Sequence, residues 1–200
     1  MQADEIKNTS TSRSMRFNKL ISGVLLGLSL VRAGAATDSA ALEKHTQNYS
    51  KNAKAILEMA ITKKIDATVV EKHVRECLAD ASWAAEEYGK AFPAGAKLLK
   101  TVVASIPAME KLDFKSLETE WHDLGYFSKP GNDPGVDLKE ESNEHFTDPI
   151  HSIVHPLLVL KAAQNYAVSK GEDDLKAVKE EMEEGLEQMD RLKKQLAEKK

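Results

Sequence analysis

The sequence predicts an all-α protein, an antiparallel four-helix bundle (up-down-up-down) with an extra short helix and one long loop. Three observations predict this fold. From residue 38 onward, apolar residues recur at steps of three and four, which is the period of an amphipathic helix. No stretch alternates apolar and polar residues between turn signals, as a half-buried strand would. The breaks between the periodic stretches are short, so successive helices are expected to lie antiparallel.

Two helices joined by a tight turn are expected first. The first covers residues 38–63, and the second begins at Asp66, whose carboxylate can cap free backbone N–H groups. Ile65 and Val70 have the spacing of a hydrophobic staple at this start, and the helix is expected to reach Tyr88. The inward faces are expected to be Leu42, His45, Tyr49, Asn52, Ile56 and Met59 in the first helix, and Val70, Val74, Cys77, Ala81, Ala84 and Tyr88 in the second.

The middle of the chain is expected to be less regular. The letters "FPAG" at residues 92–95 end the second helix. A third helical stretch over residues 96–106 runs into Pro107, which interrupts it, and residues 108–127 continue it with a kink. Pro-Gly and Asp-Pro-Gly pairs then mark the long loop at residues 128–137.

Residues 121–123 of this stretch are candidates for the core or for a functional site. Trp121 is expected to anchor the stretch in the core. His122 and Asp123 are adjacent, so in a regular helix they would point to different faces and form no dyad.

Two more helices are expected at the C-terminal end. Asp148 is predicted to cap the fourth helix, with Pro149 at its first position. Pro156 either kinks this helix or marks its true start. The last helix carries a heptad seam, which we expect to pack inside the bundle, with a homodimer through the seam as the alternative. The seam consists of Leu175, Val178, Met182, Gly185, Met189, Leu192 and Leu196.

Residues 15–35 have the three parts of a secretory signal peptide. Residues 15–19 are basic, residues 20–31 are apolar, and Ala33 and Ala35 form a cleavage pattern of small residues. The apolar run is too short to span a membrane, which takes about 20 residues. The protein is therefore expected to be exported, to a bacterial periplasm first and to the extracellular space as the alternative.

The stretch before the signal is polar, which is unusual for an exported protein. We interpret residues 1–14 as an upstream mis-start, with Met15 as the true first residue, or as a disordered prefix. Cleavage is expected after Ala35, with Ala36 as the alternative. It would leave residues 36–200 as a single helical-bundle domain, long enough to bury a core of its own.

Charge and cysteine content narrow the function classes. The chain has 28 basic and 32 acidic residues; residues 1–35 hold five and two of these, so residues 36–200 carry 23 and 30. An acidic surface disfavours nucleic acids and anionic membranes. We expect no nucleic-acid partner and no stable membrane anchor in the mature chain. Cys77 is the only cysteine, which excludes an internal disulfide.

A histidine-rich segment at the expected start of the fourth helix is the candidate metal site. Its letters are "EHFTDPIHSIVHP". His151 and His155 are four residues apart and share a face if the helix is continuous. His145, Glu144 and Asp148 can add a third imidazole and carboxylates. These ligand types suit zinc, copper or nickel. Structural histidines at a helix start are the alternative, because a HxxxH pair is not specific.

The sequence offers two weaker candidates for a metal or cofactor site. His73 and Cys77 are also four apart and could add ligands for copper or zinc, although a buried cysteine that acts as a small apolar residue is the alternative. Haem b would need a histidine facing a second histidine or a methionine, and no such pair is positioned by the sequence, so haem is not expected.

Together these features favour an exported, soluble helical bundle that binds a transition metal through its histidine-rich helix start. The alternative is a non-enzymatic structural or protein-interaction module without a cofactor, which would use the C-terminal helix or residues 128–146. The sequence shows no nucleophile–base arrangement and no phosphate-binding glycine loop, so it favours a role other than catalysis.

Overall fold

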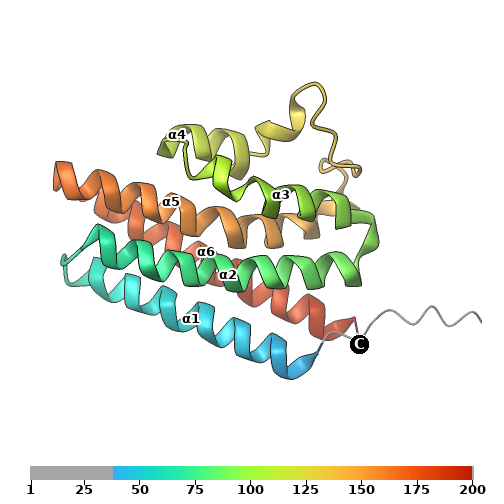
Figure 1. Ribbon diagram of the computed structural model, residues 1–200, viewed down its shortest axis with the longest axis horizontal. Coiled ribbons are helices and arrows are strands. Elements are labelled where there is room, and N and C mark those ends of the chain that lie inside the picture. The colour runs from blue at the N-terminus through green and yellow to red at the C-terminus, as the bar shows by residue number, and fades with distance from the viewer. Residues whose placement is uncertain (1–37, 200) are drawn as a thin grey trace, which may run out of the picture. The chain divides into compact units, whose positions relative to one another are not determined.

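All regular structure in residues 38–199, the part that the computed structural model describes, is helical. Four long helices form a bundle: α1 (Ser39–Ile61), α2 (Ala67–Ala91), α5 (Thr147–Ser169) and α6 (Glu172–Glu198) (Figure 1). The chain passes up and down through them in that order, and the packed neighbours are α1–α2, α2–α5, α5–α6 and α6–α1. The predicted antiparallel bundle is confirmed.

The predicted prefix, residues 1–14, and the predicted signal peptide, residues 15–35, lie outside the described residues and stay predictions. Within residues 38–199, no helix is long and apolar enough to cross a membrane.

A long segment connects α2 to α5 and lies on the outside of the bundle. In chain order it comprises η1 (Pro93–Gly95), α3 (Ala96–Met109), α4 (Phe114–Leu117), the π-helical turn η2 (Glu118–His122), η3 (Gly125–Ser128) and η4 (Glu141–Phe146). The helix α3 packs on α2 and α5, as Figure 1 shows, and η2 packs on α5. α3 runs through Pro107 and ends at Met109, two residues beyond the predicted interruption. The predicted loop lies between η3 and η4.

The inward faces predicted for α2 and α6 are confirmed, since every residue of both sets is buried. The seam of α6 therefore packs inside this chain's own bundle. The face predicted for α1 is only half right. Leu42, Tyr49 and Ile56 are buried as predicted, but Thr46, Ala53 and Ala60 are buried in place of His45, Asn52 and Met59. Two of these, His45 and Asn52, lie at the edge facing α2. There they meet Asp80 and His73 at 2.7 and 2.8 Å.

The two predicted aspartate caps have different outcomes. Asp66 caps α2 as predicted, because its carboxylate accepts the N–H groups of Thr68 and Val69. Asp148 does not cap α5, which begins one residue earlier. Its buried carboxylate instead accepts hydrogen bonds from Arg191 and Gln195 of α6, at 3.0 and 2.6 Å. The Asp148 carboxylate therefore binds side chains of the facing helix α6 instead of the backbone N–H groups at the start of α5.

The helix α5 continues through Pro156, so His151 and His155 do share one helix. Proline has no N–H, and the carbonyl of Ser152 therefore lacks its usual helical donor. The hydroxyl of Tyr49, a fully buried residue on α1, donates to this carbonyl at 3.2 Å. The proline is tolerated because a second helix supplies the missing donor.

Gly185 of α6 makes room for this contact. A Cβ atom at this position would lie 2.8 Å from the Tyr49 hydroxyl oxygen and 3.1 Å from Cβ of His155. Both distances are shorter than ordinary van der Waals contacts. Because glycine has no Cβ, α6 can approach both α1 and α5 at this level of the bundle.

We expect Tyr49→Phe to lower the free energy of unfolding by about 1–3 kcal/mol, since it leaves the buried Ser152 carbonyl without this donor. Urea unfolding followed by circular dichroism measures the change. The matched control is Tyr166→Phe on α5, which removes a hydroxyl from a half-buried ring and should shift stability by less than about 0.5 kcal/mol. Equal losses in the two variants would contradict the role assigned to the Tyr49 hydroxyl.

Candidate metal centre

Three histidines from two segments of the chain converge beside α5. His122 comes from η2, and His151 and His155 lie one turn apart on α5. Each offers one ring nitrogen, and these three atoms all lie within 4.8 Å of one another. The rings of His122 and His151 are stacked, with centroids 4.6 Å apart, and the ring of His155 meets both edge to face. This arrangement is a three-imidazole group that could hold a metal ion.

The local structure of η2 places His122 in this group. Trp121 is buried beside it and stacks on Tyr126. After η2 the chain turns sharply: Leu124 is left-handed, with φ of 60°, and a Cβ at Gly125 would lie 2.6 Å from the carbonyl oxygen of Thr119. His122 is thus presented from a short segment that is fixed on both sides.

His122 and Asp123 meet, which corrects the expectation that they face apart. His122 Nδ1 lies 3.2 Å from Asp123 Oδ1. The expectation assumed a regular α-helix, whereas η2 is a π-helical turn that ends at His122, with Asp123 as its C-cap. The sequence alone therefore does not identify His122 as a candidate metal ligand. The signals that accompany it, a buried tryptophan and a nearby glycine, do not by themselves indicate a site.

One nitrogen of each imidazole already has an oxygen partner. His122 Nδ1 faces Asp123, His151 Nε2 donates to the His122 carbonyl at 3.0 Å, and His155 Nδ1 donates to Glu181 at 2.8 Å. A nitrogen that faces an oxygen acceptor carries the hydrogen in a neutral ring, so the other nitrogen presents its lone pair. Metal-binding histidines are held in this same way, with an oxygen acceptor on the second nitrogen.

Burial favours the neutral form of one of the three imidazoles. It lowers the pKa of His151 to about 4, an effect that outweighs the opposing hydrogen bond to the His122 carbonyl. His151 is therefore neutral at neutral pH, which is the state that binds metals. His155 is fully buried, and its Nε2 has no hydrogen-bond partner. An unpartnered nitrogen of this kind is costly unless something satisfies it.

The other residues of the predicted site lie apart from this group. His145 sits with Nδ1 2.8 Å from the Tyr88 hydroxyl oxygen, and Asp148 is engaged with α6. Together with the exposed Glu144, both line a polar groove of about 690 Å³ whose wall includes His151. The structure thus brings together His151 and His155 from the predicted set, and adds His122 to them.

The weaker predicted pair, His73 and Cys77, joins no such group within residues 38–199. His73 Nδ1 lies 2.8 Å from the side-chain oxygen of Asn52. Cys77 is fully buried, and its thiol donates toward the carbonyl of Tyr49 at 3.7 Å. Burial raises the pKa of this thiol, so it stays protonated.

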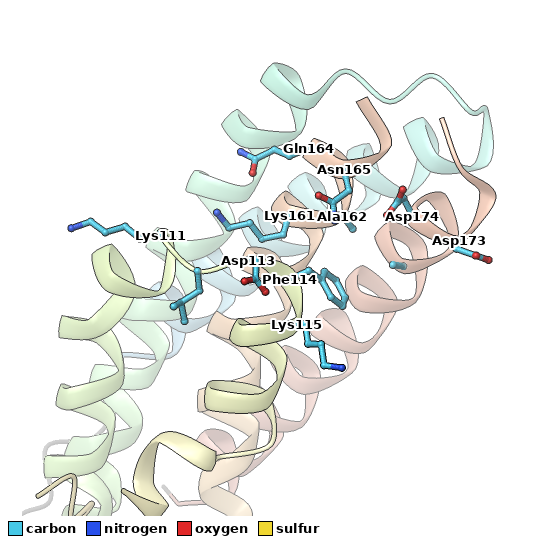
Figure 2. A pocket seen from close by; sticks show the side chains of 12 residues that line it. Lys111, Asp113, Phe114, Lys115, Lys161, Ala162, Gln164, Asn165, Asp173 and Asp174 are labelled. Atoms are coloured by element: carbon cyan, nitrogen blue, oxygen red, sulfur yellow. The ribbon is translucent and has the colours of Figure 1, made fainter. Parts of the chain in front are cut away.

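A second hollow, of about 610 Å³, lies at the other end of the bundle between the start of α4 and the α5–α6 turn (Figure 2). Its lining includes both lysines and aspartates, and Figure 2 shows Lys111 and Asp173 extending away from it. Lys161, one of its lysines, already donates to the Glu110 carbonyl at 2.6 Å. Because charges of both signs line the hollow and Lys161 already has a partner, the lining favours neither an anionic nor a cationic ligand.

The pKa of His145 predicts a pH effect on the metal-free protein. Burial lowers this pKa below 6.5, so between the two values the folded state binds fewer protons than the unfolded state. Stability is then fully present above pH 6.5 and falls as the pH drops through this window. We expect His145→Gln to weaken this fall. Urea unfolding between pH 7.5 and 5.5, with chelator, measures it, and parallel curves for the two proteins would contradict the assignment.

Comparison with known proteins gives no family for this chain. No protein-family model, no curated protein and no solved structure matches it. Function is therefore inferred from the chemistry of the site itself, since one helical architecture can host many unrelated functions.

Proposed function

We propose that this protein binds a divalent transition-metal ion through His122, His151 and His155. Two observations carry the proposal: one ring nitrogen from each of the three histidines lies within 4.8 Å of the others, and each ring also has a nitrogen that faces an oxygen acceptor. This combination supplies both the ligands and the groups that orient them.

The alternative, three purely structural histidines, explains less of the geometry. Structural histidines are expected to satisfy both ring nitrogens when they are buried. His155 forms a hydrogen bond only through Nδ1, and its buried Nε2 has no hydrogen-bond partner. A metal ion between the three rings would satisfy this atom. The polar groove that reaches His151 supports the proposal further, because it offers an ion a path from solvent.

The ligand types favour zinc, copper or nickel. Imidazole nitrogen is a good ligand for these ions, whereas calcium and magnesium prefer oxygen. We propose a binding role, because the three imidazoles supply ligands for an ion.

We also propose that binding takes place outside the cytoplasm. Support comes from the basic, apolar and small-residue parts of residues 15–35. Expression in a bacterium should yield a periplasmic protein whose intact mass corresponds to residues 36–200. A cytoplasmic protein that keeps residues 1–35 would contradict export without affecting the proposal for the metal.

We expect the untagged full-length protein to bind one ion of zinc, copper or nickel and His122→Ala to lose this binding. Calorimetric titration measures stoichiometry and affinity. At free metal about 100 times the dissociation constant, the melting temperature of the wild type should rise by about 5–10 °C. His122 is partly exposed, so the variant should fold, and a melt in chelator checks this.

His145→Ala is the matched control, because it removes a histidine from the neighbouring groove and leaves the three-histidine group intact. It should bind metal as the wild type does. Loss of binding in His145→Ala with normal binding in His122→Ala would overturn the proposed ligand set. Indifference of the wild-type melt to all three ions would overturn metal binding itself and favour the protein-interaction alternative.

A further inference from the structure

A carboxylate on α6 lies beside the unpartnered nitrogen of the metal centre. His155 donates from Nδ1 to Glu181, so Nε2 presents a lone pair and has no hydrogen-bond partner. Oε2 of Glu184 lies 3.8 Å from this nitrogen. Glu181 and Glu184 are three residues apart on α6, so they reach the imidazole from one face of that helix.

The distance of 3.8 Å excludes a direct hydrogen bond but suits two ligands of one ion. Nitrogen–oxygen hydrogen bonds extend to about 3.2 Å. Zinc binds imidazole nitrogen and carboxylate oxygen at about 2.0–2.2 Å, so two such ligands lie about 3.4 Å apart at a tetrahedral angle and further apart at wider angles. A nitrogen and an oxygen that both lack a hydrogen fit an ion shared between them.

The charges on α6 single out Glu184 from its neighbours. Its neighbours Glu180, Glu183 and Glu187 pair with Lys176, Lys179 and Arg191, respectively. Within residues 38–199, Glu184 has no lysine or arginine partner, and its side chain is 57% exposed. Its carboxylate is not one of the ligand atoms that lie within 4.8 Å of one another, so it has to move toward His122 and His151 to share an ion with them, and its exposed side chain is free to do so.

We infer that Glu184 is the fourth ligand of the metal centre, an inference that rests on the function proposed above. The site then takes three imidazoles and one carboxylate, and it joins η2, α5 and α6. The carboxylate also lowers the net charge that a divalent ion brings next to the buried His155, which reduces the cost of burying that ion. Gly185, the next residue, lets α6 come close enough for this contact.

Glu184→Gln tests the inference, with Glu183→Gln as the matched control on the exposed face of the same helix. Zinc affinity is measured by competition with a chromophoric chelator, and the ligand set is read from the visible absorption of the cobalt(II) form. We expect Glu184→Gln to bind zinc at least about tenfold more weakly than the wild type and to change the cobalt spectrum. Glu183→Gln should match the wild type in both measurements.

The two proposals fail in different ways in this experiment. If the wild type binds zinc, and Glu184→Gln keeps both its affinity and its cobalt spectrum, the fourth ligand is overturned while the three-histidine site stands. If neither the wild type nor Glu183→Gln binds zinc or cobalt, metal binding is overturned and the fourth ligand with it. Both glutamates are exposed, so circular dichroism should show that both variants fold.

Discussion

One hydrogen bond across the core, from the Tyr49 hydroxyl to the Ser152 carbonyl, is the contact on which the candidate site depends. It replaces the donor that a proline removes from α5, at the level where this helix continues through Pro156. Because α5 continues, His151 and His155 stay one turn apart on one face. The bond in turn needs Gly185, whose missing side chain allows α1, α5 and α6 to meet at one level.

The burial of α5 determines which partners its polar groups can have. It packs on α2 and α6, and α3, α4 and η2 add contacts, so most of the helix is buried. Each polar group on it therefore needs a partner within the protein. Asp148 finds two donors on α6, and the Ser152 hydroxyl donates to a carbonyl one turn earlier. Among the buried polar side chains of α5, only His155 keeps an unpartnered atom.

The segment between α2 and α5 completes the candidate site, because it adds His122 to the two histidines of α5. A buried tryptophan and a tight turn hold η2 against α5, and this rigid attachment presents His122 to the histidines of the helix. Ligands that are fixed before binding lose little conformational freedom when the ion arrives. The acidic residues Glu181 and Glu184 extend the same site to α6, so the histidines and carboxylates come from three separate segments.

The helices, their antiparallel order and most of their buried faces could be predicted from the sequence, because periodicity and capping act over a few neighbouring residues. The sequence also placed two of the three converging histidines at helical spacing. Only the tertiary structure decided that α5 passes through Pro156, that Asp148 binds α6 instead of capping, and that His122 stands beside His151 while His145 lies in the groove. Each of these depends on contacts between residues far apart in the chain, and local sequence patterns carry no information about such contacts.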